Sequence, residues 1–323
     1  MSRVTANSLP DTQNRHTASV RALGVQHEAM LERWRFQVMA RAEDVDYKVT
    51  DFTTGLSTNK STGGFAPGVG LAYRLSPNWT TGATVARGLT LVGTNATDDE
   101  APEESVNYEV FSRYLNEDQD LQADLAGFYN DYRNIKGTAS FSSGATSENL
   151  DNEYSGGRAQ VLGVEGRIAK RFQAGPVGIP VRSNLTWISA RFAQDSNSNN
   201  PEWGIGTIRS GDPLPYIPSF QATFSVGSEY RRWEQEFLFQ YTSAVYDQAT
   251  EFNRLDANTT VSRTQIPAYG IIDWNGKYRY SNTGHVFAKA DNLLGKQYAV
   301  SWRPFGLRPG KPQSFMIGVE QIF

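Results

Sequence analysis

The chain has 323 residues, 31 basic and 34 acidic side chains, 12% aromatic residues and no cysteine. The near balance of charge excludes a strongly basic nucleic-acid-binding domain, and the lack of cysteine excludes disulfide scaffolds and thiolate metal sites. The mean hydropathy is −0.50, and no stretch approaches the ~18 consecutive apolar residues that a transmembrane helix needs. The first residues also lack the apolar core of a signal peptide, so either the chain is not exported or its true beginning is missing.

Apolar residues recur at every second position along the chain. The pattern is clear at 34–41, 121–130, 220–229, 233–242 and over the last ten residues. In the third of these segments, Phe220, Phe224 and Val226 alternate with polar side chains. Because a strand sends successive side chains to opposite faces, each segment has one apolar and one polar face. About thirteen such segments predict an all-β, antiparallel fold.

The predicted strands are long, at roughly 10 to 14 residues, whereas globular strands average nearer 5 or 6. A tilted strand needs about 9–11 residues to cross the hydrocarbon layer of a membrane. If one face contacts lipid and the other a polar lumen, the average hydropathy stays low. The lengths therefore favour a transmembrane β-barrel.

The connections alternate between tight and long. Tight turns are predicted at 76–78, 116–119, 175–178, 230–232 and 281–284, and long polar stretches at about 42–63, 88–104, 134–157, 193–218, 247–265 and 293–313. Outer-membrane barrels have short periplasmic turns and long extracellular loops. The alternative is a soluble β-rich module that binds carbohydrate or a surface, for which alternation is equally natural.

Five short motifs resemble those of TonB-dependent outer-membrane receptors, in the order of that family. They are PEESVNYE at 102–109 after ARGL at 86–89, GVEG at 163–166, LPYIP at 214–218, DNLLGKQY at 291–298, and PGKP at 309–312 before a closing strand. The siderophore and ferric citrate receptors are the most similar in these motifs. The resemblance implies a bacterial outer-membrane location, transport without a resident cofactor, and no catalysis.

The resemblance also implies what such a receptor contains beyond this sequence. The family has a signal peptide, a TonB box and a plug domain, and it closes a barrel of about 22 strands. Residues 1–323 are interpreted as the C-terminal part of such a barrel, with about thirteen strands and without the plug. An odd count leaves two unpaired edges, which lipid does not tolerate. We therefore expect a truncated or split product that is not a competent transporter alone and that meets the TonB system only through the part it lacks.

Ligand capture is assigned to the long loops. Ferric siderophores and ferric citrate are often anionic or catecholate-rich, and arginine forks and aromatic faces suit both. The candidates are Trp203, Arg209, Tyr246, Arg254, Tyr298, Trp302, Arg303 and Arg308. For any single one of them, membrane anchoring, salt bridging or loop packing is the simpler role. In the family, a C-terminal strand ending in Phe, here Phe323, is a signal to the barrel-assembly machinery. The resemblance therefore implies two further partners, the barrel-assembly machinery and the lipid of the outer membrane.

Motifs of enzymes and metal sites are weak. His27 starts an HExxH-like pattern, but Leu31 stands where the second zinc-binding His belongs. His285 shares the polar face of its segment, so a phospholipase-like site would need a serine beside it. The acidic residues at 98–104 lack the spacing of a calcium loop. Lumen lining for His285 and a solvated loop for 98–104 are the favoured interpretations.

Overall fold

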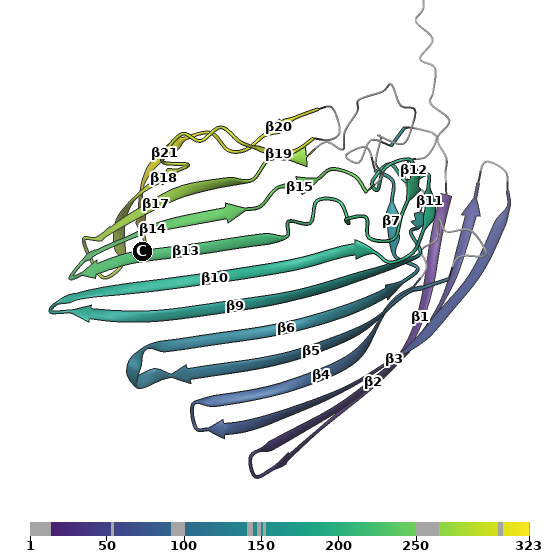
Figure 1. Ribbon diagram of the computed structural model, residues 1–323, viewed down its shortest axis with the longest axis horizontal. Coiled ribbons are helices and arrows are strands. Elements are labelled where there is room, and N and C mark those ends of the chain that lie inside the picture. Colours follow the sequence, from purple (N-terminus) through teal and green to yellow (C-terminus); the bar gives the residue numbers. More distant parts are fainter. Residues whose placement is uncertain are drawn as a thin grey trace, which may run out of the picture.

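The computed structural model describes residues 14–52, 55–91, 101–140, 145–146, 150, 153–249, 265–302 and 306–322. One antiparallel sheet of 13 strands dominates it, in the order β1-β2-β3-β4-β5-β6-β9-β10-β13-β14-β17-β18-β21. Each of these strands is hydrogen-bonded to the next one along the chain, and the sheet forms a curved wall (Figure 1). The predicted all-β antiparallel fold with about thirteen strands is confirmed. Among the described residues, no helix is long and apolar enough to cross a membrane.

The wall strands run from 8 to 20 residues. Their bounds are β1 Asn14–Leu31, β2 Trp34–Asp51, β3 Ser57–Ser76, β4 Trp79–Thr90, β5 Glu103–Asn116, β6 Leu121–Arg133, β9 Arg158–Ala174, β10 Val177–Phe192, β13 Phe220–Tyr230, β14 Trp233–Thr242, β17 Tyr269–Arg279, β18 Gly284–Asp291 and β21 Ser314–Gln321. Four two-stranded ribbons lie in the long connections: β7 Lys136–Thr138 with β8 Glu153–Ser155, β11 Ser196–Ser198 with β12 Gly206–Ile208, β15 Val245–Tyr246 with β16 Gln265–Ile266, and β19 Ala299–Ser301 with β20 Arg308–Pro309.

The tight turns all lie at the same end of the wall strands, as predicted. A 3₁₀ turn at Glu117–Gln119 joins β5 to β6 and ends at Asp120 with a left-handed φ of 48°. Gly175, with φ +59°, joins β9 to β10, and Arg231, with φ +54°, joins β13 to β14. These hairpins fix the register, so directly opposed residues share a face along the whole sheet.

The outward face of the wall is apolar. Leu125 pairs with Gly166, Gly166 with Leu185, and Leu185 with Ala222, so all four lie on this face. Leu125 is 56% exposed and Leu185 47% exposed. The inward face carries ion pairs instead, among them Arg182–Glu236 at 2.6 Å and Arg113–Asp124 at 2.6 Å. A wall with one apolar and one charged face is the arrangement of a membrane barrel.

The predicted loop at 42–63 differs from the structure. Strands β2 and β3 continue through it, with Val45 opposite Thr62 and Tyr47 opposite Lys60, so that β2 ends only at Asp51 and β3 begins at Ser57. The outward positions there are polar, as at Asp44 and Asp46, which lie near Arg21. Outside hydrocarbon a strand does not need an apolar face, so its sequence loses the alternation that marks it.

Neighbouring residues of β10 test the assignment of the two faces. We expect Leu185→Arg to destabilise the membrane-inserted chain by about 2–4 kcal/mol, because it places a charge on the lipid face. Thr186→Arg adds the same side chain to the inward face, opposite Glu165, and is the matched control. Equilibrium unfolding in phospholipid vesicles measures both. Equal losses for the two variants would contradict the assignment.

Candidate functional site

The long connections gather at the edge of the wall opposite the tight turns, and we name them the loop crown (Figure 1). It comprises the described residues of 134–157, 193–219, 243–268 and 292–313. Most of the buried apolar side chains of the described chain lie there or at the strand ends beneath it. The crown, and not the space between two sheets, is where this protein has a core.

Trp203 is the centre of the first crown cluster. It is 5% exposed and its ring meets that of Phe192 edge to face, with ring centroids 5.8 Å apart. The backbone of Gly137 and Gly156 lies so close that a Cβ on either would come within 2.7 Å of the indole. The Trp203 carbonyl accepts a hydrogen bond of 2.7 Å from the Ala249 N–H. Through its indole and its backbone carbonyl, Trp203 thus joins three connections.

Arg209 lies on a tight turn of the same connection. Its backbone N–H donates to the Asp212 carboxylate at 2.7 Å, and the Asp212 N–H donates to its carbonyl at 3.0 Å. The Arg209 side chain is exposed while Asp212 is buried. The turn therefore presents a guanidinium at the surface of the crown.

A second cluster joins the last three long connections. Val245, Ile266 and Ala299 are buried together, and Tyr216 packs against them. The Tyr216 N–H donates to the Tyr246 carbonyl at 2.9 Å, and the Ser301 hydroxyl lies 3.5 Å from the Tyr216 hydroxyl. Tyr216 has a left-handed φ of 57°. Such a conformation is uncommon for an aromatic residue, and it is held here by neighbours from two other connections.

Tyr298, Trp302 and Arg308 lie on or beside the β19–β20 ribbon. The ring of Tyr298 packs on that of Tyr269, with centroids 4.4 Å apart. Trp302 is 41% exposed, and Arg308, also exposed, pairs with Ser301. This ribbon presents an indole and a guanidinium to solvent a few residues apart.

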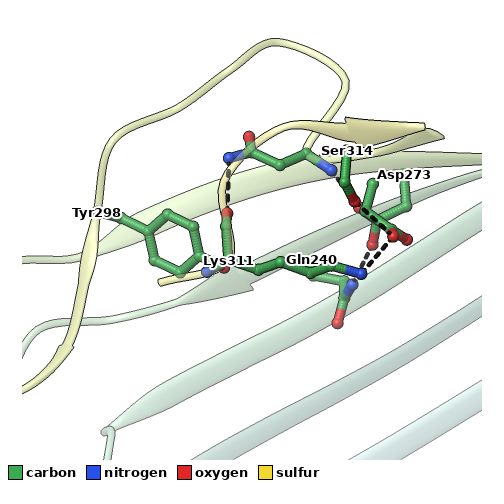
Figure 2. A network of polar contacts seen from close by, with 7 residues as sticks. Gln240, Asp273, Tyr298, Lys311 and Ser314 are labelled. Atoms are coloured by element: carbon green, nitrogen blue, oxygen red, sulfur yellow. Dashed lines mark hydrogen bonds and ion pairs between the residues drawn. The ribbon is translucent and has the colours of Figure 1, made fainter. Parts of the chain in front are cut away.

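Asn292 anchors that ribbon to the wall, because it is hydrogen-bonded to two of the residues labelled in Figure 2, Asp273 and Lys311. It is 2% exposed with φ +48°. Its side-chain amide donates to the carbonyls of Lys296 at 2.8 Å and Lys311 at 3.1 Å and accepts from the Lys296 N–H at 2.8 Å. Its own N–H donates to Asp273 at 2.7 Å. The DNLLGKQY motif is thus a structural clamp for the last long connection.

The rest of the network holds the returning chain. Lys311 forms an ion pair with Asp291, and the Ser314 hydroxyl donates to the same carboxylate at 3.1 Å. The Lys311 N–H donates to the Tyr298 hydroxyl at 3.2 Å. Gln240 donates to Asp273 at 2.7 Å from the neighbouring strand. Polar groups at the top of the inward face therefore position the aromatic side chain of Tyr298.

The eight predicted ligand residues fall into different settings. Trp203 is buried, and Tyr246 and Tyr298 are half-buried. The exposed members are Arg209, Trp302 and Arg308, and the last two share one ribbon with Tyr298. Arg254, Arg303 and the assembly-signal residue Phe323 lie outside the described residues. The part of all eight residues in ligand capture, and of Phe323 in assembly, stays a prediction. The sequence reasoning did not single out Asn292 or Tyr216, although both lie in the motifs that it recognised.

The weaker candidates have ordinary partners. In register, His285 stands between Arg279 and Glu320, not beside a serine, and its Nε2 is 3.5 Å from Glu320. Of the acidic residues at 98–104, those at 98–100 lie outside the described residues, Glu104 pairs with Arg87 at 2.6 Å and Glu103 accepts from the Lys136 N–H at 2.8 Å. In the part of the chain that the structure describes, no three His, Asp or Glu side chains gather as a metal site.

The family model for the β-barrel of TonB dependent receptor-like proteins matches residues 2–293. The chain belongs to the TonB-dependent receptor family. The predicted family is thereby confirmed, and it is a family of receptors and transporters rather than of enzymes. No curated protein sequence matches the chain.

Solved structures share the fold at low sequence identity. The FrpB iron transporter from Neisseria meningitidis matches with a TM-score of 0.71 and 14% identity, over 95% of this chain and 45% of that one. The ferric citrate transporter FecA matches with a TM-score of 0.71 and 16% identity, over 96% and 46%. The copper transporter OprC matches with a TM-score of 0.68 and 15% identity, over 95% and 48%. The chain therefore spans about half the length of these structures.

Trp203→Ala tests the packing role of the indole. We expect it to cost about 3–5 kcal/mol of local stability, because it removes a large buried aromatic side chain from the first cluster. Hydrogen exchange at the Ala249 amide, which donates to the Trp203 carbonyl, reports the loss. Trp302→Ala, at an exposed indole, is the control. Protection unchanged by Trp203→Ala would refute the packing role.

The clamp predicts a graded effect of substitutions at Asn292. Asn292→Ala removes three side-chain hydrogen bonds, at about 1 kcal/mol each, and faster proteolysis between 293 and 313 is the expected result. Asn292→Asp keeps the acceptor for the Lys296 N–H but turns a charged oxygen toward the carbonyls of Lys296 and Lys311 at a buried site, so its effect should be at least as large as that of Asn292→Ala. Limited proteolysis of the inserted chain measures this order. Equal cleavage of all three proteins would exclude the clamp.

Proposed function

We propose that this chain forms the barrel wall and the loop crown of an outer-membrane receptor that takes up ferric chelates of the siderophore or citrate type. The apolar outward face of the wall carries the proposal. Along β13, β14 and β17, the outward residues include Phe224, Phe239 and Ile272, directly opposed across the strands. An exposed apolar surface of this extent is a membrane contact or an aggregation liability. The family to which the chain belongs supports the membrane contact.

The inward face and the crown suit an anionic cargo. Tyr298, Trp302 and Arg308 combine aromatic faces with a guanidinium on one ribbon, and Arg209 adds a second exposed guanidinium on a neighbouring connection. Arginine binds carboxylate and catecholate oxygens through paired N–H donors, and aromatic rings cover the apolar parts of a chelate. The similar structures are transporters of iron, ferric citrate and copper, so the ligand class of this chain needs a direct test. TonB energises transport in this proposal through a part of the receptor outside this sequence.

Membrane insertion is the first test of the proposal. The full chain, diluted from urea into phosphatidylcholine vesicles, should float with the vesicles and stay bound after carbonate washing. The expected driving force is burial of the outward apolar side chains, at about 25 cal/mol per Å². A chain that stays dissolved without detergent and binds no vesicle would support the soluble β-rich module instead.

Ligand binding by the inserted chain is the second test. Titrated with ferric citrate, the chain should bind through the crown, and Arg308→Gln should weaken binding about five- to tenfold, since one charge-assisted contact is lost. Lys170→Gln removes a charge at the opposite edge of the wall, near Gln119, and should leave the affinity unchanged. Quenching of tryptophan fluorescence measures the affinities. Tighter binding of aqueous copper ions than of ferric citrate would overturn the ferric chelate class.

A further inference from the structure

Three arginines lie on the outward face of the wall, each at the end of its strand that is next to the loop crown, on three adjacent strands. Arg133 ends β6, Arg158 begins β9, and Arg191 lies near the end of β10. The alternation of each strand places them on the apolar side, because Arg133 follows Tyr129 by four residues and Arg158 precedes Leu162 by four. All three therefore lie on the lipid side of the wall and not in the lumen.

Arg133 and Arg158 stand directly opposite each other in the β6–β9 register. Like charges in such a pair destabilise a sheet. Asp131 offsets one of them, since its two carboxylate oxygens accept from Arg158 at 2.8 and 2.7 Å. Among the described residues, the Arg191 side chain donates to the Gly211 carbonyl alone, at 2.7 Å. The Arg133 guanidinium makes no hydrogen bond or ion pair within the described part of the chain. It interacts electrostatically with Asp131, which already binds Arg158, and it stands opposite Glu104 of β5, which pairs with Arg87. Because both carboxylates are already paired with other arginines, the row keeps an excess of positive charge.

The height of the row matches that of lipid headgroups. Tyr129 lies on the outward face beside Tyr108, with ring centroids 6.2 Å apart, as in an aromatic girdle. Arg133 is four residues further along the strand, which is a distance of about 13 Å. Because such a strand is tilted by roughly 40°, this distance corresponds to about 10 Å of height above Tyr129. The headgroup regions add roughly 5–7 Å to each side of the hydrocarbon layer, and arginine side chains extend several ångströms along the surface to reach it.

We propose that Arg133, Arg158 and Arg191 bind the phosphate group of a lipid in the leaflet on the crown side. A guanidinium pairs with phosphate through two parallel N–H donors, which suits a row of arginines better than of lysines. A phosphate between Arg133 and Arg158 also removes the repulsion of their opposed charges. The inference rests on the proposed membrane location, and it assigns a lipid partner to a surface that plays no part in ligand capture.

The test uses the full chain in neutral detergent, so that it does not depend on insertion or on ferric citrate binding. Native mass spectrometry counts short-chain phosphatidic acid retained by the protein, against phosphatidylcholine of the same length. The wild type should retain phosphatidic acid. The variant Arg133→Gln/Arg158→Gln should bind it about tenfold or more weakly, because each basic side chain near anionic lipid adds roughly a fivefold factor.

Arg167→Gln is the matched control, since Arg167 is exposed on the same strand β9 but alternates onto the inward face. It should leave phosphatidic acid binding unchanged, and thermal unfolding of all variants should show that they remain folded. Equal losses for Arg167→Gln and the double variant would overturn the proposal, as would equal retention of phosphatidylcholine. Displacement of the lipid by millimolar inorganic phosphate would also overturn it, by showing a site for the free ion. A failure of vesicle insertion would count against the proposed function alone.

Discussion

Every structural feature of this protein depends on one requirement, that backbone N–H and C=O groups be paired along strands whose outward side chains are apolar. In hydrocarbon no water replaces a missing hydrogen bond, and each unsatisfied group costs several kcal/mol. Antiparallel pairing of each wall strand with the next meets this requirement for every strand between β1 and β21, the two outer strands, each of which is paired on one side. It also divides the side chains between an apolar outward face and an inward face with ion pairs such as Arg182–Glu236.

The same requirement explains why the buried core lies in the loop crown. The wall is one sheet thick, so its two faces have no second layer to pack against. The long connections instead pack on one another, as Trp203 does with Gly137 and Gly156 and as Tyr216 does with Ala299. The result is a crown whose connections are joined by contact, which holds Tyr298, Trp302 and Arg308 on an ordered ribbon.

The sequence predicted what has a strong local signal. Alternation at 220–229 and 233–242 predicted β13 and β14, and turn residues such as Gly175 predicted the tight turns between strands. Both signals could be read because each depends only on neighbours in the chain. The extension of β2 and β3 through 42–63 was missed because outward positions there, such as Asp44 and Asp46, are polar and the alternation fades. The burial of Trp203 could not be predicted, because its contacts come from Gly137 and Gly156 in another connection and from Phe192 at the end of β10. No local pattern distinguishes such an indole from one that faces a ligand.

The number of strands in the wall has a further geometric consequence. Antiparallel order makes consecutive strands alternate in direction, so the first and the thirteenth members, β1 and β21, point the same way. These two edges cannot meet each other in antiparallel pairing, and a second copy inserted with the same orientation presents only edges of that same direction. An antiparallel neighbour that joins both edges must itself contribute an odd number of strands. Direction alone thus defines which partners can complete the ring.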